Sequence, residues 1–405
     1  MKKLLLINVS ANSGSTGRIA HQIGLLSELY GYDSTLAYGR VNNNSTIKTI
    51  RIGNDWNVKI YGIESRLFDN HGFSSRFVTK KFVKEIKEIK PDIINIHNLH
   101  GYYIHVGILF DYLKTLNVPV VWTLHDCWAF TGHCGGFDKV NCEKWKSECY
   151  DCPLKKSYPT SYILNRARSN FRKKKSLFTI LNAMTIVTPS KWLKDIVSMS
   201  FLNKYESMVI HNGVDLDVFR PNMNKPELLI DYNLTNKKII LGVADIWSKR
   251  KGLDDFVKLA NMVSPDYQII LVGIKDKDLD RLPTSIIGIK RTENVQQLAD
   301  LYAFADVFVN PTAWDNFPTT NIEALACGTP VITYRTGGSP EAIDENTGIV
   351  VEKGDVDALK NAIVKVCNKD REAYRVICRT RAECLFNKND RFLDYIKLFD
   401  SLVNK

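Results

Sequence analysis

The chain has 405 residues, of which 44 % are hydrophobic and 24 % are charged, as in ordinary globular proteins and unlike disordered or collagen-like ones. This length exceeds what one hydrophobic core usually supports and predicts two domains of about 200 residues each. Lys and Arg (55) outnumber Asp and Glu (44), which gives a net charge of +11. No aromatic and basic motif of a nucleic-acid-binding module accompanies this surplus, so we expect no nucleic-acid partner.

The first ten residues, MKKLLLINVS, form a short apolar run that ends at Asn8 and Ser10. The run is too short for the apolar region of a signal peptide, so we interpret it as a first β-strand. No segment approaches the ~18 uninterrupted apolar residues that indicate a membrane span. These features predict a cytoplasmic protein and leave open a peripheral contact with the cytoplasmic face of the inner membrane.

Short β-branched runs alternate with longer amphipathic segments along the whole chain, which is typical of parallel sheets covered by helices on both faces. The strands expected in the first half are 4–9, 92–97, 118–124, 184–188 and 208–211. Those expected in the second half are 238–243, 267–272, 285–289, 307–310, 330–334 and 348–351. The fold class is therefore α/β with two Rossmann-like, doubly wound domains. Such domains bind ligands beyond the carboxyl ends of their strands.

A turn-rich segment, residues 212–226, separates the two series of strands and helices. We predict a first domain over 1–215, with a Cys-rich insertion at 127–153, and a second domain over 216–385. A terminal helix over 386–405 carries an apolar stripe and should pack on one of the two domains.

Two local clusters hold part of the positive charge. The first comprises Lys80, Lys81, Lys84, Lys87 and Lys90 in one helical stretch, and the second is the run 172–175, RKKK. Either cluster could contact phosphates or an anionic lipid leaflet. The simpler interpretation, a solvated helix face, is favoured for both.

The most informative segment follows the strand expected at 307–310. A loop with Asp315 and Asn316 leads to a helix that begins near Thr319 or Thr320 and ends before Gly328. A helix N-terminus at a strand end is an anion site, because its free N–H groups and its dipole attract phosphate. Glu323, one turn further, could accept two hydrogen bonds from a ribose diol. The alternative is a capping box, Thr320 with Glu323, which needs no ligand.

These residues resemble a known family. The acidic-x7-Glu pattern of Asp315 and Glu323, followed by Ala-x-Ala-Cys-Gly-Thr-Pro-Val, is similar to the donor-site signature of retaining glycosyltransferases of family 4 with the GT-B fold. The resemblance is greatest to the capsule, O-antigen and colanic-acid branch. It implies that Glu323 binds the nucleotide ribose and that Asp315, which replaces the family's usual Glu, contacts the sugar. Asn316, Phe317, Thr319 and Thr320 would line the donor site.

Two further segments of the second half fit this resemblance. Arg250 and Lys251 follow a strand where paired cations would neutralise a leaving diphosphate, and Lys251-Gly252 matches the Lys-Gly of the family. Ile246 stands where the family has an Arg, so we expect Arg250 to replace it. The Gly337-Gly338-Ser-Pro-Glu segment is similar to a loop at the edge of the donor site.

The first half supplies the remaining candidates. Gly14 and Gly17 resemble a Gly-rich loop that approaches the donor phosphates, although such glycines also serve simple packing. His125 and Asp126 end a strand, and the resemblance implies that His125 contacts the transferred sugar. We therefore predict that His125, Asp126 and Asp315 are catalytic. His97 and His100 also follow a strand and would line an acceptor groove.

Five of the nine cysteines lie within 26 residues. Cys134, Cys142, Cys149 and Cys152 have the ligand types and the Cys-x2-Cys pair of a closed zinc site. Free thiols, two disulfides and an iron–sulfur cluster are the alternatives; in a reducing cytosol zinc is favoured over disulfides.

Together these features predict a GT-B protein whose two domains face a central cleft. The first domain should bind the acceptor and the second the donor, and the resemblance implies that the terminal helix crosses back to the first domain. The implied activity is retaining transfer of a sugar from a UDP- or GDP-sugar to a growing, lipid-linked oligosaccharide in surface polysaccharide biosynthesis, such as capsule or lipopolysaccharide. No cofactor is required at the donor phosphates, because Arg250, Lys251 and helix dipoles supply the positive charge; a structural zinc is the one expected ion. The alternatives are a non-catalytic nucleotide-sugar or zinc-dependent binding protein and a GT-B nucleotide-sugar epimerase.

Overall fold

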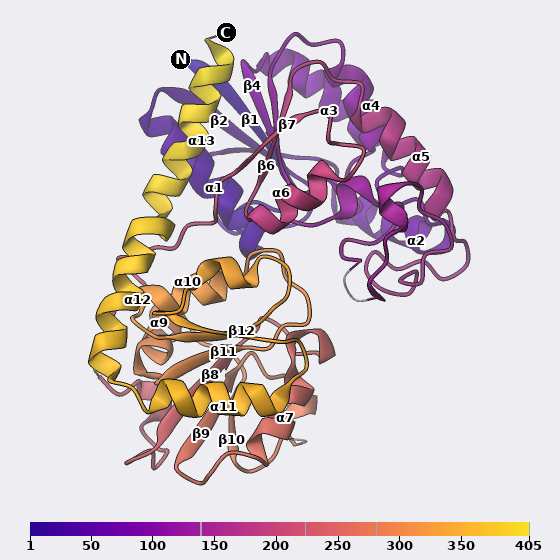
Figure 1. Ribbon diagram of the computed structural model, residues 1–405. Helices are drawn as coiled ribbons and strands as arrows, with labels where there is room; N and C mark the ends of the chain where they lie inside the picture. The colour runs from indigo at the N-terminus through magenta and orange to yellow at the C-terminus, as the bar shows by residue number, and fades with distance from the viewer. Residues whose placement is uncertain (138–139, 223, 281, 405) are drawn as a thin grey trace. The chain divides into compact units, whose positions relative to one another are not determined.

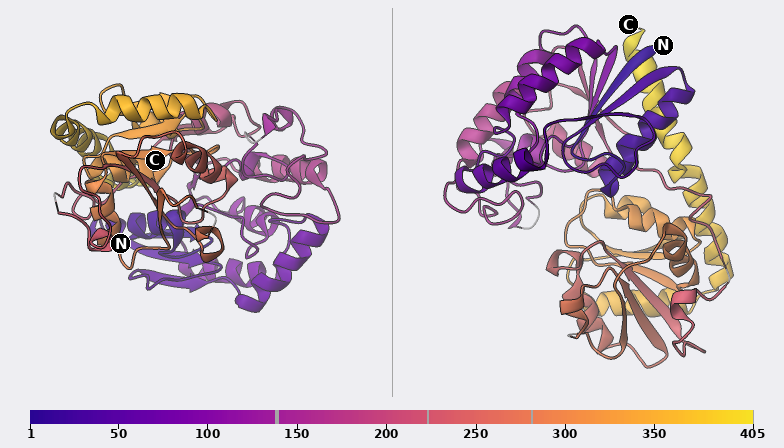
Figure 2. Two further views of the ribbon diagram at one scale, coloured as in Figure 1. Left: turned by 90° about the horizontal axis from the view of Figure 1, so that it is seen from below. Right: turned by 180° about the vertical axis from the view of Figure 1, so that it is seen from behind.

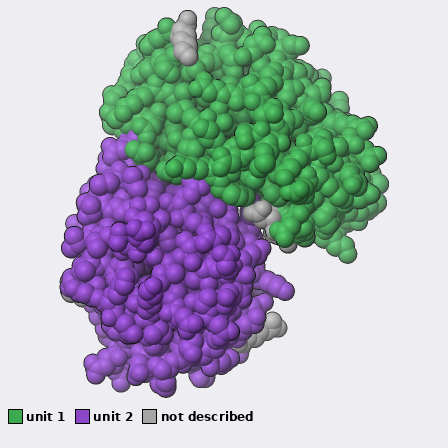
Figure 3. Space-filling view, in the orientation of Figure 1, with its two compact units in different colours: residues 1–211, 391–405 green, residues 212–390 purple. Residues whose placement is uncertain are grey.

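A computed structural model describes residues 1–137, 140–222, 224–280 and 282–404. These residues form two compact units, shown in different colours in Figure 3. Unit 1 comprises residues 1–211 and 391–405, and unit 2 comprises residues 212–390. The division between them lies at the start of the turn-rich segment 212–226.

Unit 1 is built on a seven-stranded, fully parallel sheet of order β3-β2-β1-β4-β5-β6-β7. Its strands are β1 (Lys2–Asn8), β2 (Tyr32–Tyr38), β3 (Lys48–Arg51), β4 (Ile93–Ile96), β5 (Val120–Thr123), β6 (Met184–Thr188) and β7 (Glu206–Val209). Its helices are α1 (Gly14–Leu29), α2 (Asp55–Phe68), α3 (Arg76–Ile89), α4 (Val106–Leu113), α5 (Ala167–Phe178) and α6 (Lys191–Ser198). Short 3-10 helices are η1 (Trp128–Phe130) and η3 (Lys144–Lys146).

Unit 2 repeats this architecture with a six-stranded parallel sheet of order β10-β9-β8-β11-β12-β13. The strands are β8 (Lys238–Val243), β9 (Tyr267–Val272), β10 (Ile286–Ile289), β11 (Val307–Asn310), β12 (Val331–Tyr334) and β13 (Gly348–Val351). The helices are α7 (Leu253–Ala260), α8 (Asp276–Leu279), α9 (Val295–Phe304), α10 (Thr319–Ala326), α11 (Val356–Cys367) and α12 (Arg371–Phe386), with 3-10 turns η4 (Glu227–Leu229), η5 (Lys249–Lys251) and η6 (Ser339–Ala342). Figures 1 and 2 show helices on both faces of each sheet. The predicted α/β class with two Rossmann-like domains is confirmed.

Two strands, β2 and β3, were not predicted from the sequence. Strand β2 pairs with β1 along its whole length, yet its sequence YDSTLAY carries Asp33, Ser34 and Thr35 in a row. The hydroxyl of Ser34 is buried and donates a hydrogen bond to the carbonyl oxygen of Gly24 in α1. A polar residue satisfied in this way breaks the apolar run that marks a buried strand. Strand β3 is a four-residue edge strand with no fully buried side chain.

The C-terminal helix α13 (Lys388–Val403) spans the boundary between the two groups of residues, and its last part packs on unit 1. The predicted apolar stripe supplies the contact, since Phe392, Tyr395, Ile396 and Phe399 are buried in a cluster that includes residues of β1. Asp400 adds an ion pair with Lys2 at 3.0 Å and a 2.9 Å hydrogen bond from Tyr32 Oη. The N- and C-terminal segments of the chain are therefore held together within one unit.

The two basic clusters have different environments. The five lysines of the first cluster lie on or directly after α3 and are all exposed, as expected of a solvated face. In the second cluster this expectation is wrong for Lys174, whose side chain on α5 is buried. Its ammonium group donates to the carbonyl oxygens of Trp128 at 2.7 Å and Thr131 at 3.1 Å and lies 3.5 Å from the centre of the Trp128 ring. Burial lowers the pKa of Lys174 to about 7.

Within the described residues, no helix combines the length and the apolar character needed to cross a bilayer.

Candidate active site

In unit 2 the candidate residues gather where the strand order reverses. Strands β8 and β11 are neighbours, but the chain continues from β8 toward β9 and from β11 toward β12. The loops that follow β8 and β11 therefore diverge at the carboxyl edge of the sheet, and doubly wound sheets bind their ligands at this point. The loop after β8 carries Arg250 and Lys251, and the loop after β11 carries Asp315 and Asn316.

The structure brings these two loops into direct contact. Lys251 Nζ lies 2.8 Å from Asp315 Oδ2, and each side chain is about one fifth exposed (21 % and 23 %). Arg250 donates to the carbonyl oxygen of Trp314 at 3.1 Å, and the backbone N–H of Ala313 donates to the carbonyl oxygen of Arg250 at 2.8 Å. Both predicted cations are thus fixed beside the predicted catalytic carboxylate, and the edge of the site remains open to water.

Glycines allow these backbones to approach each other. Gly252, which ends η5, has a φ of +80°, and a Cβ there would lie 2.5 Å from the carbonyl oxygen of Pro311. Gly337 has a φ of +53°, and a Cβ there would lie 1.8 Å from the carbonyl oxygen of Asp315. The N–H of Gly338 donates to the carbonyl oxygen of Asn316 at 2.9 Å. The Gly-Gly loop therefore lies directly against the Asp315–Asn316 segment.

Helix α10 begins in this site at Thr319, as predicted. The N-cap residue is Pro318, whose side chain makes no capping hydrogen bond. The alternative capping box of Thr320 and Glu323 is wrong, because both residues lie inside the helix. The N-cap side chain thus makes no hydrogen bond to the first turn, which suits a bound anion. Thr319 and Thr320 are half-buried, whereas the ring of Phe317 is buried and packs against Phe386 at 5.8 Å between ring centres.

Glu323 is held by a residue that the sequence analysis did not select. Its Oε2 accepts a hydrogen bond of 3.1 Å from Tyr302 Oη, which comes from α9. Tyr302 is fully buried, and burial together with Glu323 raises its pKa well above the usual range. The neutral phenol therefore remains a donor and fixes the carboxylate. Tyr302 lies on an apolar helix face, so its sequence position gave no sign of this role.

A buried polar network fixes the loops from below. Asn321 in α10 accepts from Asn310 at the end of β11 (2.7 Å) and donates to the hydroxyl and carbonyl oxygens of Ser339 in η6 (3.0 and 3.2 Å). Thr333 at the end of β12 completes the network with a 2.6 Å hydrogen bond to Ser339. Because all four side chains are buried, the network joins α10, β11, β12 and η6 rigidly. Of these four residues, Ser339 lies in the Gly-Gly-Ser-Pro-Glu segment, which was the only sequence pattern that pointed to this network.

In unit 1 the predicted residues follow β1, β4 and β5, which are neighbours in the sheet. Helix α1 begins at Gly14, whose φ is +65°, and a Cβ at Gly17 would lie 2.7 Å from Ser10 Oγ. Gly17 thus permits close packing of the helix on the loop, and the N-cap Ser13 makes no side-chain capping bond. The N–H of Asn98, after β4, donates to the amide oxygen of Asn8 at 3.2 Å.

His125 and His97 contact each other at the ends of β5 and β4. His97 Nδ1 lies 3.0 Å from His125 Nε2, and the two ring planes differ by only 14°. Burial lowers the pKa of His125 to about 4 and that of His97 well below its usual range. Both rings are therefore neutral at physiological pH.

Asp126 does not join the pair of His97 and His125 but contacts Trp128 and His100. Its Oδ1 accepts from the N–H of Trp128 at 2.8 Å, and its Oδ2 lies 2.7 Å from His100 Nε2. His100 Nδ1 in turn lies 3.2 Å from Tyr158 Oη. Although burial opposes ionisation, His100 and the Trp128 N–H lower the pKa of Asp126 below its usual value, so this carboxylate is charged. Asp126 thus supports the loop after β5 and holds His100.

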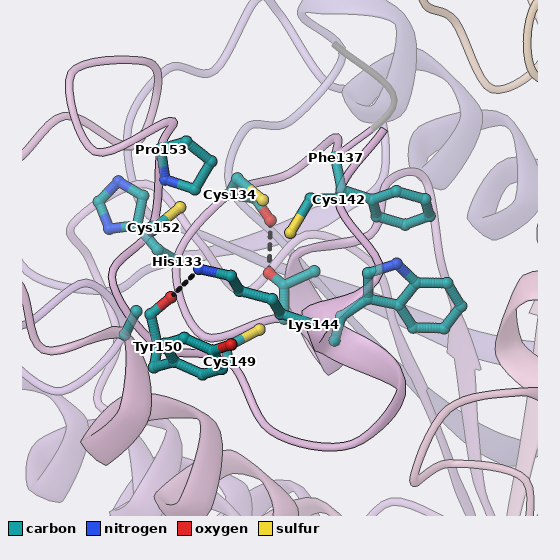
Figure 4. A pocket seen from close by; sticks show the side chains of 12 residues that line it. His133, Cys134, Phe137, Cys142, Lys144, Cys149, Tyr150, Cys152 and Pro153 are labelled. Carbon is teal, nitrogen blue, oxygen red and sulfur yellow. Dashed lines mark hydrogen bonds between the residues drawn. The ribbon is translucent and has the colours of Figure 1, made fainter. Parts of the chain in front are cut away.

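The four cysteines of the predicted zinc site line one small pocket of about 20 Å³ (Figure 4). Cys134 is buried and the other three, Cys142, Cys149 and Cys152, are partly buried; all are free thiols. The thiol of Cys134 hydrogen-bonds to Cys152, and this bond lowers the pKa of Cys152 below the usual range of a thiol. In the described part of the chain, no three Cys, His, Asp or Glu side chains are already arranged to hold a metal ion. The zinc site stays a prediction.

Comparisons with known proteins find glycosyltransferase families in both halves of the chain. The family described as Glycosyltransferase Family 4 matches residues 31–218, and the family described as Glycosyl transferases group 1 matches residues 237–369. WcaC of Escherichia coli (strain K12), named as a colanic acid biosynthesis glycosyl transferase, is 24 % identical over 387 residues, which cover 87 % of this chain and 88 % of WcaC. The capsular polysaccharide biosynthesis glycosyltransferase CapM of Staphylococcus aureus is 28 % identical over 222 residues, covering 51 % of this chain and 58 % of CapM.

Solved structures show the same fold. The sucrose-phosphate synthase of Thermosynechococcus elongatus superimposes with a TM-score of 0.74 at 19 % identity and covers 99 % of both chains. HepE of Anabaena, solved in complex with UDP, superimposes with a TM-score of 0.69 at 15 % identity and covers 99 % of this chain and 100 % of HepE. With a family match in each half and this fold throughout, the chain belongs to the group 1 glycosyltransferases of family 4, which have the GT-B fold.

Proposed function

We propose that this glycosyltransferase moves a sugar from a UDP- or GDP-sugar to an acceptor hydroxyl with retention of the anomeric configuration. The observation that carries the proposal is the contact of Lys251 with Asp315 beside the uncapped N-terminus of α10. The relatives named for colanic acid and capsule synthesis, and the UDP bound in HepE, support a nucleotide-sugar donor.

In the proposed reaction the bond between the sugar C1 and the donor phosphate breaks while a new bond forms from the acceptor oxygen to C1 on the same face. The acceptor proton passes to the leaving phosphate oxygen. Lys251, Arg250 and the first-turn N–H groups of α10 stabilise the negative charge that develops on the diphosphate. Because these groups supply positive charge at one edge of the sheet, we propose that the donor needs no divalent metal.

The proposed acceptor is a growing oligosaccharide on a polyprenyl-diphosphate carrier at the cytoplasmic face of the inner membrane. The exposed lysines of α3 support it, because juxtamembrane basic residues are attracted to anionic leaflets. Transfer to such an acceptor in vesicles, compared with and without anionic lipid, tests this assignment. Equal rates in both kinds of vesicle would argue against a role of the basic face.

Replacing Glu323 tests the donor site. We expect Glu323→Ala to weaken donor binding by about 10- to 100-fold, because a hydrogen bond from a ribose hydroxyl to a carboxylate contributes roughly 1.5–3 kcal/mol. The measurement is a thermal-shift titration of the full chain with UDP- and GDP-sugars, in which a bound ligand raises the melting temperature.

The control is Tyr302→Phe, which removes the same intramolecular hydrogen bond and keeps the carboxylate. If Glu323→Ala keeps wild-type donor affinity, Glu323 does not bind the ribose, whereas equal losses in both variants would show that the donor site also needs the hydrogen bond from Tyr302. Retained affinity in Tyr302→Phe and lost affinity in Glu323→Ala support the proposal.

We also propose that the pocket of Figure 4 binds one structural zinc through Cys134, Cys142, Cys149 and Cys152. The four thiols share one pocket, and tetrahedral zinc takes four such ligands. Binding would draw the sulfur atoms closer than the structure has them. Elemental analysis should find about one zinc per chain in wild type and none in a Cys149→Ser, Cys152→Ser double variant. Metal-free wild-type protein with unchanged stability would refute the site.

A further inference from the structure

A row of buried polar side chains ends at His125. Asn95 lies within β4, His97 follows β4, and His125 follows β5. The amide oxygen of Asn95 lies 2.9 Å from His97 Nε2, and His97 Nδ1 lies 3.0 Å from His125 Nε2. Asn95 is also bonded to β5 on its other side, and each link of the row joins one pair of atoms, so the positions of the hydrogens can be deduced along the row.

The donor-to-acceptor direction of the hydrogen bonds in this row is set at Asn95. Its amide nitrogen donates to the carbonyl oxygen of Val121 at 3.1 Å and to Thr123 Oγ1 at 3.2 Å. A backbone carbonyl oxygen can only accept, so the atom of Asn95 that faces Val121 is the NH₂ group. The atom that faces His97 is then the amide oxygen, which also can only accept. His97 Nε2 must therefore carry a hydrogen.

His97 carries only this one ring hydrogen. It is 1 % exposed, and burial and the neighbouring His125 keep its pKa well below the usual range. No carboxylate among its described contacts would stabilise a charged ring. The neutral ring thus has a lone pair on Nδ1, and His125 Nε2 must donate to it.

The same logic fixes the second nitrogen of His125. With its hydrogen on Nε2 and a neutral ring, His125 has a lone pair on Nδ1. Among the residues that the structure describes, none hydrogen-bonds to this atom, and the side chain is partly exposed at the carboxyl edge of the sheet. A partly exposed acceptor held by a buried row of donors points to a ligand that donates a hydrogen bond.

We propose that Asn95 and His97 are positioning residues that hold His125 as the Nε2–H tautomer, so that its Nδ1 accepts a hydrogen bond from a hydroxyl of the bound sugar. This inference rests on the proposed glycosyl transfer, in which His125 contacts the transferred sugar, and adds which ring nitrogen makes that contact and which residues hold the ring. Because the pKa of His125 is about 4, the ring accepts the hydrogen bond without taking the proton. The acceptor proton then remains for the leaving phosphate.

The tautomer can be measured without any activity. In long-range ¹H–¹⁵N spectra of the full chain labelled with ¹⁵N-histidine, and with His125 assigned by its substitution, wild type should show His125 as the Nε2–H tautomer at neutral pH. An Nδ1–H tautomer or a charged ring at His125 would overturn the proposal even if the protein is an active glycosyltransferase. Conversely, the expected tautomer in a protein without transferase activity would separate this inference from the proposed function.

Substitutions at His97 give the kinetic test. His97→Gln keeps an acceptor for His125 and a donor for Asn95, whereas His97→Leu keeps neither. We expect His97→Leu to lower kcat on the order of 10- to 100-fold, the size of loss found when the outer partner of a metal-binding histidine is removed, and His97→Gln to recover most of it. His21→Leu removes another buried histidine of unit 1, whose ring hydrogen-bonds to Ser45 and Thr46, and should leave kcat unchanged. Equal losses in both His97 variants would show that His97 acts only through packing.

Discussion

Lys251→Ala should lower kcat for glycosyl transfer by about 10²- to 10³-fold, which is the usual effect of removing one group that stabilises charge developing in a transition state. Lys251 Nζ lies 2.8 Å from Asp315 in the loop ahead of α10, so its ammonium group is held where the donor diphosphate is expected. The effect should appear mainly in kcat, because the charge on the leaving diphosphate increases only as the bond to C1 breaks. Steady-state kinetics with the preferred nucleotide sugar measures it.

Lys249→Ala is the matched control for this prediction. Lys249 belongs to the same 3-10 turn, η5, but its side chain is exposed. It should therefore change kcat by less than a factor of about two, since isolated surface charges contribute little. Similar losses at both positions would show that the general positive charge of the turn matters and not the specific placement of Lys251.

Gly337→Ala should abolish most of the donor binding. Two costs combine here: an L-residue in the left-handed region costs roughly 1–2 kcal/mol, and the new Cβ would lie 1.8 Å from the carbonyl oxygen of Asp315. The clash must move either the Gly-Gly loop or the Asp315–Asn316 segment. Calorimetric titration with nucleotide sugar should show a large loss of affinity, on the order of the 100-fold by which a misplacement of about 1 Å can lower reaction rates.

Gly354→Ala separates the clash from the backbone cost. Gly354 also has a positive φ, +84°, but a Cβ there would meet no atom within 4 Å. Both variants should lose stability, and only Gly337→Ala should also lose donor affinity in the molecules that remain folded. If Gly354→Ala weakens binding as strongly, the effect is a general loss of stability and the Gly337 contact has no special role.

The sequence predicted much of the fold because most strands are buried on both faces. Strands β6, β8, β9, β11 and β13 lie where the apolar runs placed them, since burial on both faces demands such runs. Strand β2 was missed because Ser34 is satisfied by a carbonyl of α1, a partner that no local pattern reveals. Lys174 was misjudged for the same reason: its charge suggested water, but Trp128 and Thr131 accept its hydrogen bonds in the interior.

The candidate site was likewise predicted only in part. Glu323, Lys251 and the start of α10 were identified because their residue types carry chemistry at strand ends. Tyr302, Asn321 and Asn95 were not, since each acts by holding another side chain across the fold. Such partners are distant in sequence, and their residue types are common in cores. Only the three-dimensional structure shows that the residues of each unit are supported by buried hydrogen bonds.

The measurement that tests the central claim most directly is glycosyl transfer by the purified full chain. Radiolabelled UDP- and GDP-sugars would be mixed with vesicles that contain polyprenyl-diphosphate-linked oligosaccharides, without added divalent metal. We predict label in the lipid-linked fraction, release of one nucleoside diphosphate per sugar transferred, and the same anomeric configuration in product and donor. A donor that binds without transfer to any acceptor would indicate a binding protein, an altered free nucleotide sugar would indicate an epimerase, and an inverted product would contradict the retaining mechanism.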